Sequence, residues 1–133
     1  NEIFIIEVNP RTIGGLCSRS LNFNLFRNSL EEVILSDLLL DKKISLDLAS
    51  TSSGVLMLPI PSEGVFKGLN NENKAKEISE VVNIDISLPL GSYVKKPPFS
   101  ERYLGFVYAN GENNHRTTEA LLQCEKILSP IIE

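Results

Sequence analysis

The chain has 133 residues, of which 42% are hydrophobic and 23% are charged, a balance typical of a globular domain and not of a disordered chain. Thirteen Lys and Arg against seventeen Asp and Glu give a net charge of −4 without a basic block, so we expect no nucleic-acid partner. No apolar run approaches the roughly 18 residues that a membrane span needs, so we expect no membrane partner either.

The start of the chain and its two cysteines suggest where the protein belongs. The chain opens at Asn1 without Met or signal-peptide features, and residues 3–8 already have the pattern of a strand. We therefore expect a piece of a longer protein, with an ordinary processed N-terminus as the alternative. Cys17 and Cys124 lack metal-ligand spacing. Two free thiols in a reducing compartment are favoured over one disulfide, which predicts a cytoplasmic protein.

The first fifty residues contain one predicted strand and one predicted helix. Residues 3–8 (Ile-Phe-Ile-Ile-Glu-Val) are rich in strand formers, which is typical of a short buried strand. Ser29, with Glu32 three residues later, forms a capping box, and apolar residues at helical spacing predict a helix over residues 30–40. Residues 41–48 fit either an extension of this helix or a linker strand.

A second block begins near Thr51, where Thr-Ser-Ser-Gly indicates a boundary. Ile84, Ile86 and Leu88 alternate with polar residues, as in a half-buried strand. The order β-β-α-β-β-α predicts an α+β fold in which a small antiparallel sheet carries its helices on one face. The expected elements are a strand over 54–60, a hairpin turn over 61–64 into Val65 and Phe66, a short helix over 71–81, a strand over 84–88, a loop over 91–102, a strand over 103–109, and a last helix capped by Asn114 with an apolar stripe from Ala120 to Ile131.

Polar side chains follow the first predicted strand. Glu7 and Asn9 are two residues apart, so in a strand they point to the same side and present two hard oxygen donors there. Such donors suit Mg²⁺, which usually keeps waters and bridges to substrate phosphates. Arg11 adds a planar group that can grip a phosphate or carboxylate with two hydrogen bonds. The alternative interpretation is a polar strand end followed by an Asn-Pro turn.

The run Ile6-Glu7-Val8-Asn9-Pro10-Arg11, followed by Gly14-Gly15, resembles the end of the catalytic core in ATP-grasp enzymes. That superfamily includes carboxylate–amine ligases, biotin carboxylase and the large subunit of carbamoyl phosphate synthetase. The resemblance implies that Glu7 and Asn9 bind the Mg²⁺ that bridges the phosphates of ATP. It also implies that Arg11 contacts the transferred phosphate or the acyl-phosphate intermediate.

The second half is similar to the C-terminal subdomain of L-amino-acid-ligase-like ATP-grasp proteins. The similarity lies in Gly54 to Pro59, in Gly64-Val65 and Gly68, and in the run from Arg102 to Gly111 that leads into the last helix. Together, the two resemblances imply that residues 1–50 are the C-terminal end of an ATP-grasp core and that residues 51–133 form a C-terminal α+β subdomain.

The resemblance implies a function for the parent protein. ATP would phosphorylate a small carboxylate substrate, and an amine would displace the phosphate to form an amide. The lysine pair, glycine-rich loop and adenine pocket of such enzymes have no counterpart in the six residues before Glu7, so we expect the chain to be inactive without the remainder of the ATP-grasp protein. The alternative is a non-catalytic α+β interaction module, or a split-gene subunit whose partner chain binds ATP.

Three further features each have a functional and an ordinary interpretation. Arg19 lies where the family's substrate-facing loop would run and could hold a substrate carboxylate, or it could be a surface arginine. Cys17 could line a substrate pocket, although a small buried hydrophobe is favoured. His115 is interpreted as a solvated residue at a helix start, and the loop with Lys95 and Lys96 as an exposed connector that could cover a site.

Overall fold

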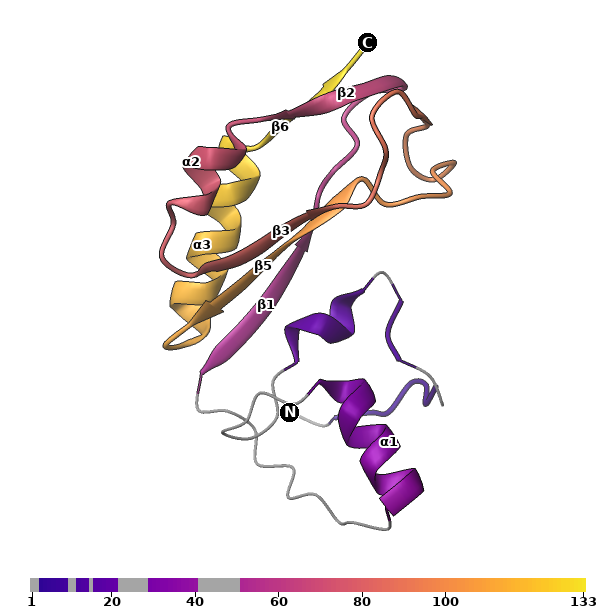
Figure 1. Ribbon diagram of the computed structural model, residues 1–133, viewed down its shortest axis with the longest axis vertical. Helices are drawn as coiled ribbons and strands as arrows, with labels where there is room; N and C mark the ends of the chain where they lie inside the picture. The colour runs from indigo at the N-terminus through magenta and orange to yellow at the C-terminus, as the bar shows by residue number, and fades with distance from the viewer. Residues whose placement is uncertain (1–2, 10–11, 15, 22–28, 41–50) are drawn as a thin grey trace.

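The computed structural model describes residues 3–9, 12–14, 16–21, 29–40 and 51–133. Two small antiparallel sheets and helix α3 form the larger part of the molecule, and a 3₁₀ helix, η1 (Cys17–Ser20), and helix α1 (Leu30–Leu40) belong to the part that precedes them (Figure 1). The predicted α+β class is confirmed. None of the helices in these described ranges combines the length and the apolar character needed to cross a membrane.

The first sheet joins the three strands that the sequence predicted to pair. β5 (Gly105–Gly111) lies in the middle and pairs antiparallel with β1 (Ser52–Met57) and β3 (Val81–Ile86). Helix α3 (Asn114–Ile127) packs on β1 and β5, and the short helix α2 (Glu72–Lys76) lies beside it against β3 (Figure 1). The prediction of one antiparallel sheet with the last helix packed on it is therefore confirmed.

The middle strand is buried on both of its faces. Val107, which pairs with Leu56 and Ile84 in the neighbouring strands, belongs to the core under the helices. Phe106 and Tyr108 have the opposite orientation because side chains alternate along a strand, and they are only 1% and 7% exposed. Since η1 packs against β1, the preceding part of the chain covers some of this second face.

The second sheet differs from the prediction. β2 (Gly64–Asn70) pairs with β4 (Tyr93–Val94) and β6 (Ser129–Ile132), whereas the sequence predicted a hairpin between β1 and β2. Pro59 and Pro61 follow the end of β1 and lack the N–H group that an antiparallel ladder needs, so the chain leaves the first sheet before β2 begins.

Three other segments also differ from the secondary structure predicted for them. Residues 91–102, predicted as a loop, contain the short strand β4. Ile131, predicted in the apolar stripe of the last helix, lies in β6 instead, because α3 ends at Ile127 and Pro130 cannot continue a helix. The predicted helix over 71–81 is only the five-residue α2, since Val81 already pairs with Ala109 in the first sheet.

Of the two capping residues predicted from the sequence, that of α1 is confirmed and that of α3 is wrong. The predicted helix α1 is confirmed, and the backbone N–H of Glu32 donates to Ser29 Oγ at 3.1 Å. In α3 the capping side chain is that of Asn113, whose Oδ1 accepts from the backbone N–H of Arg116 at 3.1 Å. Asn114, the predicted cap, is already helical, and its Oδ1 accepts from the hydroxyl of Ser52.

The segment predicted as the first buried strand is not a strand in the structure. Residues 3–9 pair with none of the strands in the described part of the chain. The apolar side chains of residues 3, 4, 5, 6 and 8 are 76–98% exposed. Without a neighbouring strand to receive its N–H and C=O groups, an apolar sequence alone cannot form a ladder.

Candidate functional site

The two predicted metal ligands meet in the structure. The amide nitrogen Nδ2 of Asn9 donates a hydrogen bond to Glu7 Oε1 at 2.8 Å. Both residues are exposed and lie two positions apart in the segment that follows Ile6. A carboxylate and an amide are thus held within reach of one another, on a surface open to a ligand.

The chemistry of this pair fits Mg²⁺ as part of a coordination shell. Glu7 offers a carboxylate oxygen, and rotation of the Asn9 amide would bring its oxygen to the place that the nitrogen now occupies. Across the described ranges, no group of three His, Cys, Asp or Glu residues could hold an ion by itself. The remaining ligands would therefore come from water or from phosphate oxygens, which is usual for Mg²⁺. The third predicted site residue, Arg11, lies outside the described residues.

The fourth predicted site residue, Arg19, contacts the first sheet. Its Nη1 atom lies 3.0 Å from Asp85 Oδ2, and the two side chains are 55% and 29% exposed. Asp85 is in β3, on the face of the sheet opposite to the helices, because Ile84 and Ile86 point into the core. The guanidinium still has donors in contact with solvent, so an anion can approach the pair from outside.

A buried tyrosine holds the segment next to Arg19. The hydroxyl of Tyr108 donates to the backbone carbonyl of Leu16 at 3.2 Å, which anchors the start of η1 on β5. Burial raises the pKa of the Tyr108 phenol above its ordinary value of 10.0, against the opposing effect of the Arg19 charge, while Asp85 and Cys17 raise it further. The hydroxyl therefore keeps its proton at neutral pH and remains a donor.

Sequence reasoning missed Asp85 and Tyr108. The sequence contains one indication of Asp85, which is a carboxylate on the polar side of an alternating strand. This pattern is as typical of a solvated strand face as of a functional site. The sequence contains no indication that Tyr108 has a functional role, because tyrosine is common in strands. Their proximity to Arg19 depends on the tertiary arrangement of η1, β3 and β5.

Both cysteines are reduced and buried. Cys17 is 7% exposed in η1 and Cys124 is fully buried under the first sheet, and neither is in a disulfide. The two thiols thus agree with the interpretation as small buried hydrophobes. Burial raises the pKa of the Cys124 thiol above its ordinary value of 9.0, which keeps it protonated and unreactive.

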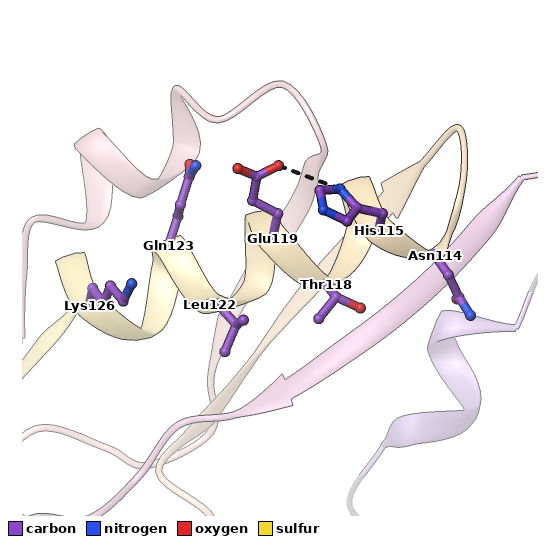
Figure 2. A pocket seen from close by; sticks show the side chains of 7 residues that line it. All are labelled: Asn114, His115, Thr118, Glu119, Leu122, Gln123 and Lys126. Carbon is purple, nitrogen blue, oxygen red and sulfur yellow. Dashed lines mark ion pairs between the residues drawn. The ribbon is translucent and has the colours of Figure 1, made fainter.

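A hollow of about 640 Å³ runs along the outer side of α3 (Figure 2). In this view His115 and Glu119 lie on one side of the helix, and Thr118 and Leu122 on the other. His115 is 85% exposed, with Nδ1 3.9 Å from Glu119 Oε2, as expected for a solvated residue at a helix start. Among the described residues, the lining of this hollow comes from α3 alone, namely from Asn114, His115, Thr118, Glu119, Leu122, Gln123 and Lys126.

Two further cavities flank the loop that leads to β5. One, of about 370 Å³, is lined by residues 92–95 and 99–102 and includes Lys95. The other, of about 380 Å³, lies between residues 57–60 and the loop residues 97–98 and 100–104. Residues 100–102 form the wall that the two cavities share.

Comparison with known proteins identifies a family. The sequence profile described as "L-amino acid ligase C-terminal domain 2" matches residues 56–133. Among solved structures, an L-amino acid ligase from Bacillus licheniformis superimposes with a TM-score of 0.68 at 14% sequence identity, over 80% of this chain and 27% of that protein. A search among curated proteins gave no significant match. The resemblance found in the sequence is thereby confirmed, while the predicted division at residue 50 stays a prediction.

Proposed function

Because the chain belongs to the family of L-amino acid ligase C-terminal domain 2, we propose that it is the C-terminal part of an ATP-grasp carboxylate–amine ligase. The profile match over residues 56–133 is the observation that carries this proposal. The chain spans 27% of the length of the solved ligase that it matches, so the remaining domains of the enzyme would lie elsewhere in the parent protein. Its reduced, buried thiols favour a cytoplasmic location.

We assign the metal role to Glu7 and Asn9. Their contact supports the assignment because a cation placed between them would meet a carboxylate and, after rotation of the amide, an amide oxygen. Bound Mg²⁺ would supply positive charge next to the phosphates of ATP. The hydrogen bond from the Asn9 amide to Glu7 already brings the two side chains together.

The two arginines would act on substrate. A guanidinium binds phosphate and carboxylate with paired hydrogen bonds, which a lysine cannot reproduce. On the family pattern, Arg11 would grip the transferred phosphoryl group. Arg19 would face the substrate, and Asp85 would orient its guanidinium through the 3.0 Å contact, while about half of the Arg19 side chain stays exposed to solvent.

The coding sequence upstream of Asn1 gives the first test. The ligase proposal expects several hundred codons that encode a lysine and a glycine-rich phosphate loop, since phosphoryl transfer depends on positioning the nucleotide. An upstream sequence without these features would instead support the interaction module, and a separate gene that encodes them would support the split arrangement.

Substitutions in the parent ligase give the second test. Glu7→Gln and Asn9→Ala should each lower ATP-dependent phosphate release by roughly a hundredfold or more, because metal charge stabilisation contributes several kcal/mol to this chemistry. Their unfolding midpoints should match that of the wild type, since both side chains are exposed. Glu63→Gln, at another exposed glutamate, is the matched control. Near-normal turnover of both variants would refute the metal role.

A further inference from the structure

The cavity lined by residues 92–95 and 99–102 encloses about 370 Å³ and is built on strand β4 of the second sheet. Ligand pockets in proteins usually enclose about 300–1,000 Å³. The lining includes neither Glu7 nor Asn9, and it lies within the range that the family profile covers. The size therefore fits a small molecule bound at a place other than the proposed metal ligands.

Hydrogen bonds hold both sides of this cavity in place. β4 pairs with β2, and the N–H of Phe66 donates to the Ser92 carbonyl at 2.9 Å. Because Phe66 is fully buried, residues 92–94 take their position from the core. On the other side the hydroxyl of Ser100 donates to the Arg102 carbonyl at 2.7 Å, which holds the segment that carries Arg102. The cavity is therefore preformed, as small-molecule sites usually are.

Two exposed aromatic side chains line the cavity. Tyr93 is 63% exposed and Phe99 is 71% exposed. Val94 is only 5% exposed, so the alternation of side chains along the strand places Tyr93 and Lys95 together on the outer side. Neither ring contacts another aromatic ring of the described residues. Both rings can therefore stack on a planar group of a ligand.

The same cavity carries more positive than negative charge. Lys95 and Arg102 line it together with one carboxylate, that of Glu101. None of these three side chains forms an ion pair or a hydrogen bond with the part of the chain that the structure describes. Residues 92–102 contain three cationic residues and one acidic residue, in a chain whose net charge is −4. This segment is thus a local region of positive charge that attracts an anion.

We propose that this cavity binds a nucleoside phosphate. The base would stack on the rings of Tyr93 and Phe99, because every base presents a π face. The phosphate would receive paired hydrogen bonds from Arg102 and the charge of Lys95. The ribose hydroxyls would donate to the carboxylate of Glu101. Each of the three parts of a nucleotide thus has a partner of matching chemistry in the lining.

Other ligand classes use only part of this lining. A sugar phosphate would leave both aromatic rings in water, and an uncharged aromatic molecule would leave both cations without an anion. An anionic lipid surface could contact the rings and the cations, but it would not fill an enclosed space of about 370 Å³. A nucleoside phosphate uses the rings, the cations and the space together.

Calorimetric titration of the full 133-residue chain with AMP, combined with NMR, tests the proposal. The buffer contains EDTA, so that a metal at Glu7 and Asn9 cannot contribute to binding. We expect saturable binding, with chemical-shift changes centred on residues 92–95 and 99–102. Adenosine lacks the phosphate and ribose 5-phosphate lacks the base, so each should bind about tenfold more weakly or worse.

Three results of this titration would overturn the proposal. They are the absence of saturable AMP binding, equal binding of AMP and adenosine, and binding of a single-stranded oligonucleotide or of anionic vesicles without binding of AMP.

Variants of the rings and of the cations test the two halves of the site separately. The double variant Tyr93→Leu and Phe99→Leu should weaken AMP binding about tenfold and leave ribose 5-phosphate binding unchanged. Arg102→Gln should weaken the binding of both ligands about tenfold. Lys74→Gln, at an exposed lysine of α2, loses the same charge and should bind as the wild type does. Unchanged AMP binding in either folded ring or arginine variant would overturn the proposal. None of these measurements involves Glu7, so this proposal and the ligase proposal can fail independently.

Discussion

The guanidinium of Arg19 and the carboxylate of Asp85 lie 3.0 Å apart, although 66 positions separate the two residues in the sequence. Together with the hydrogen bond from Tyr108 to the Leu16 carbonyl, this contact attaches η1 to the first sheet. The segment after the proposed metal ligands therefore takes its position from the same sheet that supports the C-terminal helices.

The Arg19–Asp85 pair should contribute little to stability. Because both side chains are partly exposed, a double-mutant cycle with Arg19→Gln and Asp85→Asn should give a coupling energy of about 1 kcal/mol or less, falling further at high salt. Urea denaturation of the four proteins gives this value. A coupling energy several times larger would contradict the partial exposure of the two side chains.

Phe66 should be among the costliest side chains to truncate. It is fully buried in β2, so Phe66→Ala removes a large apolar group and leaves a cavity, at an expected loss of about 3–5 kcal/mol of unfolding free energy. Phe99→Ala is the matched control, because Phe99 is 71% exposed. Chemical denaturation measures both. Similar losses in the two variants would contradict the assignment of the core.

The cap of α3 can be distinguished from its neighbour by mutation. Asn113→Ala removes the acceptor for the Arg116 N–H and should cost about 1 kcal/mol. Asn114→Ala removes only an exposed hydrogen bond with Ser52 and should cost less. Thermal unfolding of the two variants compares their losses of stability. A larger loss in Asn114→Ala than in Asn113→Ala would identify Asn114 as the capping residue.

Glu80 should make stability depend on acid pH. Hydrogen bonds from Ser79 and from the backbone, together with the charge of Arg116, lower the pKa of the Glu80 carboxyl below its ordinary value of 4.5. Folding therefore favours the ionised form. The contribution is complete above pH 4.5 and is lost as the pH falls through the lower folded-state pKa.

Comparison of the wild type with Glu80→Gln measures this contribution. The difference between their unfolding free energies should be constant above pH 4.5 and should shrink as the pH falls below it. Glu125→Gln, at an exposed glutamate of α3 without an ion pair to any described residue, controls for net charge. A difference that grows toward acid pH would contradict the lowered pKa of Glu80.

Local pattern was sufficient to predict the individual strands of the first sheet and two of the helices. The alternation at Ile84 and Ile86 and the helical spacing after Ser29 each depend on neighbours within a few residues. Glu7 and Asn9 do contact one another, but the strand from which their proximity was predicted is absent from the described residues.

Non-local pairing was beyond the reach of the same reasoning. β2 pairs with β6, whose residues follow it by about sixty positions, and Ile131 lies four residues after Ile127, a spacing that fits a helix as well as a strand pair. Arg19 could be identified as a candidate from its place after the motif. Its partner could not, because nothing near Asp85 in the sequence indicates which distant cation will reach it.

The middle position of β5 determines when the first sheet can form during synthesis. β1 ends at Met57 and β3 at Ile86, but neither has a partner in this sheet before Gly105–Gly111 has been added. As the chain leaves the ribosome, both strands emerge with unpaired edges, the kind of surface that promotes aggregation. β2 likewise waits for β6, at residues 129–132. The two sheets therefore complete their pairing only after residues 105–111 and 129–132 have been added to the chain.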